Sequence, residues 1–106
     1  MLRAARLQLG MAEISTVRLR ALFGRPLADA ELSEAVQVAA TQLAQRSGIV
    51  LHGMTTDATS ITLTLGCDKL TALGFLTELR ATTNAWYEAK FEAGPLWGNM
   101  PEEGNT

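Results

Sequence analysis

Apolar and polar residues alternate over positions 15–23. In an extended conformation Val17 and Leu19 fall on one side, and Arg18 and Arg20 fall on the other. This pattern predicts a half-buried strand. A helix over the same positions would also gather apolar side chains on one face, so a helix is the alternative.

Positions 6–10 alternate in the same way, and Gly10 would allow the chain to turn back into a hairpin with the strand predicted at 15–23. However, the run that begins at Met11 would itself be a reasonable start for a protein. Residues 1–10 are therefore either a peripheral strand or an extension with no role in packing.

Two longer stretches have the spacing of amphipathic helices. The first, residues 29–46, has acidic residues in its first turns, Arg46 in its last turn and a single narrow apolar stripe. The second begins at Asp68, a preferred N-cap residue, and runs without proline to about Lys90. One face of this second helix carries Ala72, Phe75, Leu76, Leu79, Thr83 and Trp86.

Between the two helices, residues 49–54 and 60–65 are rich in β-branched side chains and flank a polar segment at 55–59. This arrangement predicts a β-hairpin. Alternation directs Ile49, Leu51, Ile61, Leu63 and Leu65 to the core. It directs to the other face Val50, His52, Met54, Thr62 and Thr64.

Strand, helix, hairpin and helix together predict an α+β fold related to the ferredoxin-like sandwich, with a small antiparallel sheet covered on one face by two helices. We expect residues 1–93 to form the single domain. Residues 94–106 are rich in helix and strand breakers, so they are predicted to be a coil tail that is disordered at its end and supplies no closing strand. A strand at 6–10 would occupy the edge where the closing strand normally lies.

Composition limits the classes of protein that fit. The 106 residues are 47% hydrophobic and 19% charged, which suits one domain with a packed core. A single cysteine excludes an intramolecular disulfide and favours a reducing compartment, so we expect a cytoplasmic protein. The apolar runs are too short to span a membrane. Only His52 and Cys67 are available as soft ligands, so no structural zinc site or other metal is expected.

The net charge of −2 is unevenly distributed: residues 1–28 carry five arginines and one glutamate, and residues 29–106 carry four basic and ten acidic residues. Such asymmetry can mark a nucleic-acid arm or a subunit contact. The predicted open face has no aromatic residue on which a base would stack, and no phosphate-binding glycine motif occurs. Nucleic acid and nucleotide cofactors are therefore disfavoured.

The predicted open sheet face is the first candidate for a binding surface. It is expected to carry Arg18, Arg20, Val50, His52, Met54, Thr62 and Thr64. This mixture is apolar enough for a partner to bury, so we expect a homodimer or higher oligomer, with a small-molecule ligand as a further possibility. The alternative is a solvent-facing sheet with cross-strand threonine pairs.

The end of the second helix is the other candidate, because residues 86–97 hold four of the six aromatic residues. We expect Trp86, Tyr87 and Trp97 to pack across a subunit boundary or to line a pocket. The alternative is that the tail folds back over its own helix and seals the core.

Three residues are candidates for chemistry. Cys67 lies at a helix start, where amide dipoles lower a thiol pKa, and His52 is the only imidazole. Asp57 is placed in a hairpin turn, where it is expected to bind its own backbone rather than to act as a base. Because polar clusters are scarce, we predict a non-enzymatic interaction or regulatory module. The alternative is a small cofactor-independent enzyme that uses His52, Asp57 or Cys67 in a pocket at the subunit boundary.

Overall fold

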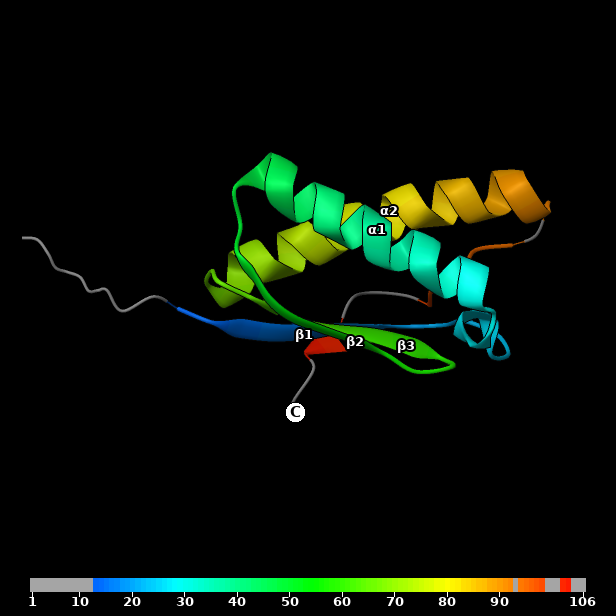
Figure 1. The fold of residues 1–106 in the computed structure, drawn as a ribbon, viewed down its shortest axis with the longest axis horizontal. Coiled ribbons are helices and arrows are strands. Elements are labelled where there is room, and N and C mark those ends of the chain that lie inside the picture. The colour runs from blue at the N-terminus through cyan, green and yellow to red at the C-terminus, as the bar shows by residue number, and fades with distance from the viewer. Residues whose placement is uncertain (1–12, 93, 99–101, 104–106) are drawn as a thin grey trace, which may run out of the picture.

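A sheet of four antiparallel strands lies against two helices in the computed structural model, which describes residues 13–92, 94–98 and 102–103 (Figure 1). Both helices lie on the same face of the sheet. The predicted α+β class, with a small antiparallel sheet covered on one face, is confirmed. The elements are β1 (Ser15–Arg20), a 3-10 turn (Pro26–Ala28), α1 (Ala30–Ser47), β2 (Leu51–Thr56), β3 (Ser60–Leu65), α2 (Lys69–Phe91) and β4 (Glu102–Glu103).

Strand β1 is one of the two inner strands of the sheet, in which the strand order is β2-β3-β1-β4. Val17 and Leu19 are buried, whereas Arg18 and Arg20 lie on the opposite face, as the alternation predicts. The helical alternative for this segment is wrong. The strand ends at Arg20 rather than at position 23.

Both helices begin where an aspartate accepts hydrogen bonds from the exposed amides of the first turn. The side chain of Asp29 accepts from the amides of Glu31 and Leu32 at 2.9 and 3.1 Å, and that of Asp68 accepts from the amide of Thr71 at 2.7 Å. Helix α1 ends at Gly48, whose φ of 72° is in the left-handed region that favours glycine. These caps fix where the two helices begin and where α1 ends.

One register shift in β2 overturns a sequence-based prediction. Leu51 and Gly53 are two residues apart, yet they pair with consecutive residues of β3, so β2 contains one extra residue. Such a bulge reverses the alternation beyond it. Met54 consequently lies opposite Leu63 and packs against the core. The prediction that Met54 lies on the open face is therefore wrong.

The tail also differs from its prediction. Leu96 and Trp97 are buried in the core, with exposed fractions of 2% and 1%, and Glu102–Glu103 pairs with β1 as the closing strand β4. The tail is therefore not merely a coil outside a 1–93 domain. The strand predicted at residues 6–10 and the predicted disorder of the chain end lie outside the described residues.

Hydrogen bonds from helix α2 explain how a segment rich in breakers becomes part of the fold. The Asn84 side-chain oxygen accepts from the amides of Leu96 and Trp97 at 2.9 and 3.0 Å. The indole Nε1 of Trp97 donates to Thr83 Oγ1 at 2.7 Å. These bonds satisfy polar groups that would otherwise be costly to bury, so the tail can be buried beside α2.

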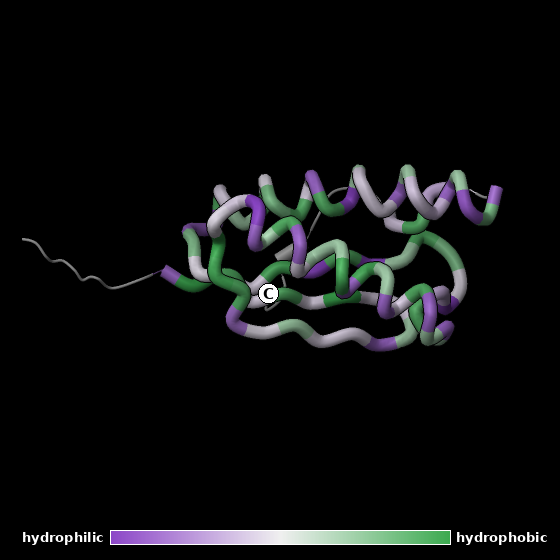
Figure 2. The backbone as a smooth tube through the Cα atoms, turned by 45° about the horizontal axis from the view of Figure 1, so that its top comes forward, coloured by the Kyte–Doolittle hydropathy of each residue, from purple (hydrophilic) through white to green (hydrophobic). Residues whose placement is uncertain are grey.

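Hydrophobic and hydrophilic residues alternate along both helices, as Figure 2 shows. The buried apolar side chains of each helix face the sheet, where they form one core with Val17, Leu19 and Leu63. Within the described ranges, no helix is long and apolar enough to cross a membrane.

Candidate functional site

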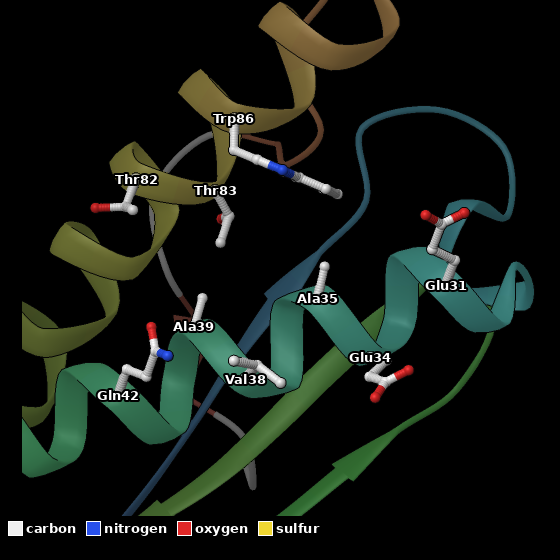
Figure 3. A pocket seen from close by; sticks show the side chains of 9 residues that line it. All are labelled: Glu31, Glu34, Ala35, Val38, Ala39, Gln42, Thr82, Thr83 and Trp86. Atoms are coloured by element: carbon white, nitrogen blue, oxygen red, sulfur yellow. The ribbon is translucent and has the colours of Figure 1, made fainter.

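An open hollow of about 430 Å³ lies between α1 and α2 (Figure 3). The small side chains of Ala35 and Ala39 leave room beside α2, and the ring of Trp86 reaches from α2 toward α1. Two carboxylates and one amide, those of Glu31, Glu34 and Gln42, border this apolar base. The lining residues are Glu31, Glu34, Ala35, Val38, Ala39, Gln42, Thr82, Thr83 and Trp86.

The ring of Trp86 is held by two neighbours on its own helix. Phe91 meets it edge to face, with the ring centroids 6.1 Å apart, and Lys90 Nζ lies 5.9 Å from its centroid. Lys90 Nζ also lies 3.5 Å from a carboxylate oxygen of Glu31 on α1. This exposed ion pair contributes little stability, but it connects the two helices at one end of the hollow.

A second hollow of about 470 Å³ lies on the other side of α1, toward β2. Its lining residues are Glu34, Gln37, Val38, Thr41, Gln42, Gln45 and Met54. Glu34, Val38 and Gln42 thus line both hollows. They form a row between two depressions, and Val38 is exposed over 45% of its surface.

Arg46 continues this row by one further helical turn and lines a smaller hollow beside Gln42. We call Glu34, Val38, Gln42 and Arg46 the α1 ridge. This row was not predicted, because the sequence pattern indicated a single apolar stripe for α1. The available signal was Val38, an apolar residue outside that stripe.

The open sheet face keeps most of its predicted polar residues. Arg18 lies opposite Thr62 across β1 and β3, and its Nε donates to Thr62 Oγ1 at 3.1 Å. Thr64 lies on the same face, and Arg20 is exposed at the strand end. With Met54 turned to the core, this part of the face is composed of arginine and threonine.

His52 is exposed at the bulge, close to the backbone of Gly66. A Cβ added at Gly66 would lie 2.9 Å from His52 Nε2. Glycine at this position therefore makes room for the imidazole. His52 lies at the end of the sheet, away from Arg18 and Thr62 in the strand centres.

The structure separates the aromatic residues predicted to act together. Trp97 is buried in the core of its own chain, as the alternative prediction had it, whereas Trp86 and Tyr87 are half-buried at the surface. Helix α2 has 23 residues, about 35 Å, and its last turns extend beyond the six-residue strands (Figure 1). The ring centroids of Tyr87 and Phe91 are 5.0 Å apart.

Tyr87 also borders a small hollow of about 120 Å³ at this end of the molecule. Its other lining residues are Phe23, Pro26, Gly94, Pro95 and Leu96. Phe23 is 78% exposed there. At this end of the molecule Trp97 is therefore buried in the core, whereas Tyr87 and Phe23 form a separate exposed rim around the small hollow.

The environment of Cys67 differs from the one predicted. Burial raises the pKa of the Cys67 thiol, and the carboxylates of Asp68 and Glu13 raise it further. These effects outweigh the lowering expected at a helix start, because the charged thiolate is disfavoured near carboxylates. Ser15 Oγ donates to the backbone oxygen of Cys67 at 2.9 Å and fixes this corner against β1.

Asp57 has the turn-forming role predicted for it. Its Oδ1 accepts from the amide of Thr59 at 2.8 Å and from Ser60 Oγ at 3.1 Å, and these bonds lower the pKa of its carboxyl group. Asp57 and Cys67 flank opposite ends of β3, a six-residue strand that spans about 20 Å. The structure therefore does not bring Asp57 together with Cys67.

Across residues 13–92, 94–98 and 102–103, no group of three or more His, Cys, Asp or Glu side chains is placed to hold a metal ion. Besides the small exposed rim at Tyr87 and Phe23, two larger surfaces are candidate sites: the α1 ridge with its hollows, and the open sheet face. No protein-family model matches this sequence, and no curated protein matches it either.

Proposed function

We propose that this protein is a non-enzymatic interaction module that binds its partner through the outer side of the helix pair. The observation that supports this is the α1 ridge, an exposed row with Val38 at its middle and a hollow on each side. Trp86 forms one wall. Interface centres typically combine an aromatic anchor and apolar depressions with a polar rim.

The open sheet face has less support as the binding surface. Its central arginine already donates to a threonine on the neighbouring strand, and of its two apolar candidates Met54 faces the core, which leaves Val50, 59% exposed just before β2. Cross-strand polar pairs of this kind stabilise a face that remains in contact with water. A partner would bury little apolar area there.

The enzyme alternative has less support still. Its three candidate groups do not share a pocket, since Asp57 lies in the turn at the other end of β3. The raised pKa of Cys67 keeps its thiol protonated at neutral pH, which does not favour a nucleophile. A single cysteine also fits a reducing compartment, so we propose that the protein acts in the cytoplasm.

We further propose that the partner is a second copy of the chain. Sedimentation velocity over a wide concentration range tests this. We expect a mass that rises with concentration from 11.4 kDa toward twice that value. A mass that stays at 11.4 kDa up to high micromolar concentration would contradict self-association.

Val38→Asp tests the surface. A carboxylate at the middle of the α1 ridge would have to lose its hydration in the interface, so we expect dissociation to rise at least about tenfold. Leu70→Asp is the matched control, because Leu70 is 81% exposed on α2 and lines none of the hollows around α1. Equal effects of the two substitutions would show that the helix surface is not specifically involved.

A further inference from the structure

The α1 ridge is acidic at one end and basic at the other, so two ridges that run in opposite directions have complementary charges. Its four members are spaced by four residues, so they lie in one row along the helix. Glu34 is at one end and Arg46 at the other, with Val38 and Gln42 between them. The midpoint of the row falls at Ala40, which is buried beneath it.

We propose that two copies of this chain pack α1 against α1 in antiparallel orientation, about a twofold axis that passes over Ala40. Glu34 then faces Arg46 of the partner subunit, and Val38 packs against Gln42 of the partner subunit. The proposal rests on the proposed function, self-association through the helix surface, and it names the partner and its orientation.

The shape of the surface suits this packing. Rows with four-residue spacing run obliquely along a helix, and the rows of two facing helices become parallel when the helices cross at about 50°. The hollows of about 430 and 470 Å³ on the two sides of the row leave it prominent, so that it can meet the same row of a second copy. Trp86 and Met54 line their far sides and would supply apolar contact. The row then forms the same contact on both subunits, as a twofold interface requires.

The charges select the orientation. Glu34 and Arg46 each lie six residues from the midpoint, about 9 Å along the axis, where long side chains can reach across two diverging helices. A parallel arrangement would place Glu34 beside the same residue of the other copy, and like charges oppose that. Only the antiparallel arrangement forms two oppositely charged pairs.

The present partner of Arg46 does not prevent this. Arg46 lies 3.5 Å from Glu78 on α2, but their side chains are 65% and 58% exposed. An exposed pair of this kind is weak, so the guanidinium can shift toward a new carboxylate at little cost. Arg46 can also contact both carboxylates, because its planar group has five N–H donors.

Charge reversal on both ends of the row tests the proposal by sedimentation. Glu34→Arg alone and Arg46→Glu alone each replace two attractive pairs by two like-charged pairs, so each should raise the dimer dissociation constant about tenfold. The double variant restores opposite charges and should recover to within about threefold of the wild type. Glu88→Arg is the matched control, since Glu88 is an exposed glutamate on α2 outside all the hollows around α1.

Position 46 carries a glutamate in both the Arg46→Glu variant and the double variant, so its interaction with Glu78 is the same in both. Recovery in the double variant relative to Arg46→Glu therefore cannot arise from Glu78. A wild-type protein that remains monomeric overturns the proposed function and this inference together. A wild-type dimer that neither single reversal weakens overturns the inference alone. If both reversals weaken the dimer and the double variant does not recover, the pairing of Glu34 with Arg46 is wrong.

Discussion

The open sheet face and the outer side of the helix pair are both left uncovered by the described residues, but their side chains differ in what they already contact. On the sheet, Arg18 and Thr62 bind each other across two strands. On the helices, Val38 is exposed and Trp86 borders a hollow. A polar face whose groups are paired gains little from a partner, whereas an apolar hollow gains by losing water. Whether the side chains of an uncovered surface already bind one another is thus a better guide to binding than the size of that surface.

Substitution of the two tryptophans should give the largest effects and tests whether the helix surface, unlike the core, is used for binding. Trp97→Ala removes a fully buried side chain and leaves the Thr83 hydroxyl without its indole donor, so we expect a loss of about 3 to 5 kcal/mol in the free energy of unfolding. Trp86→Ala should cost only about 1 kcal/mol and should weaken self-association instead. Urea denaturation at low protein concentration measures the first effect, and sedimentation measures the second.

Trp97→Phe serves as the control for the core, because it keeps an aromatic ring and loses the Nε1 hydrogen bond; its cost should lie between those of the other two variants. If Trp86→Ala were as destabilising as Trp97→Ala, the hollow between the helices would belong to the core rather than to a binding surface.

The turn between β2 and β3 allows a test by pH. Hydrogen bonds from Thr59 and Ser60 lower the pKa of Asp57 below its ordinary value of 3.8. The carboxylate therefore stabilises the fold fully above that value, and its contribution is lost as the pH falls through the lower pKa of the folded state. Thermal midpoints between pH 6 and pH 2 should fall less steeply for Asp57→Asn than for the wild type. Parallel curves would show that the turn does not depend on the charge.

The smallest effect is expected on the open sheet face. Thr62→Val removes the acceptor for Arg18 Nε but keeps a β-branched side chain, so we expect a change of less than about 1 kcal/mol in stability. Dimer dissociation should stay at the wild-type value. A marked change in dissociation would move the interface to the sheet and reverse the comparison.

Local signals in the sequence were sufficient for much of the fold. Asp68 is followed by a long one-sided apolar pattern, and the structure starts α2 one residue later. Asp57 stands among turn residues between two β-branched runs, and it forms that turn. In each case the decisive hydrogen bonds join residues two or three positions apart, so composition over a short window contains the information.

The failures have a different physical origin. Met54 is misplaced because alternation is read from one strand, while the bulge is a property of two paired strands. Burial of Trp97 depends on hydrogen bonds to Asn84 and Thr83, 13 and 14 residues earlier in the chain. The hollows beside Val38 depend on how far α1 stands from α2 and β2. None of these distances is encoded within a short stretch of sequence.

The unequal burial of the two tryptophans makes the protein its own spectroscopic reporter. The chain contains only these two indoles. Trp97 is sealed from solvent, so it should emit at shorter wavelength and resist quenching by iodide, while the half-buried Trp86 should emit at longer wavelength and be quenched. Occupation of the helix surface would protect Trp86 without altering Trp97, and unfolding would expose both. Fluorescence from an unlabelled sample can therefore distinguish binding from loss of structure.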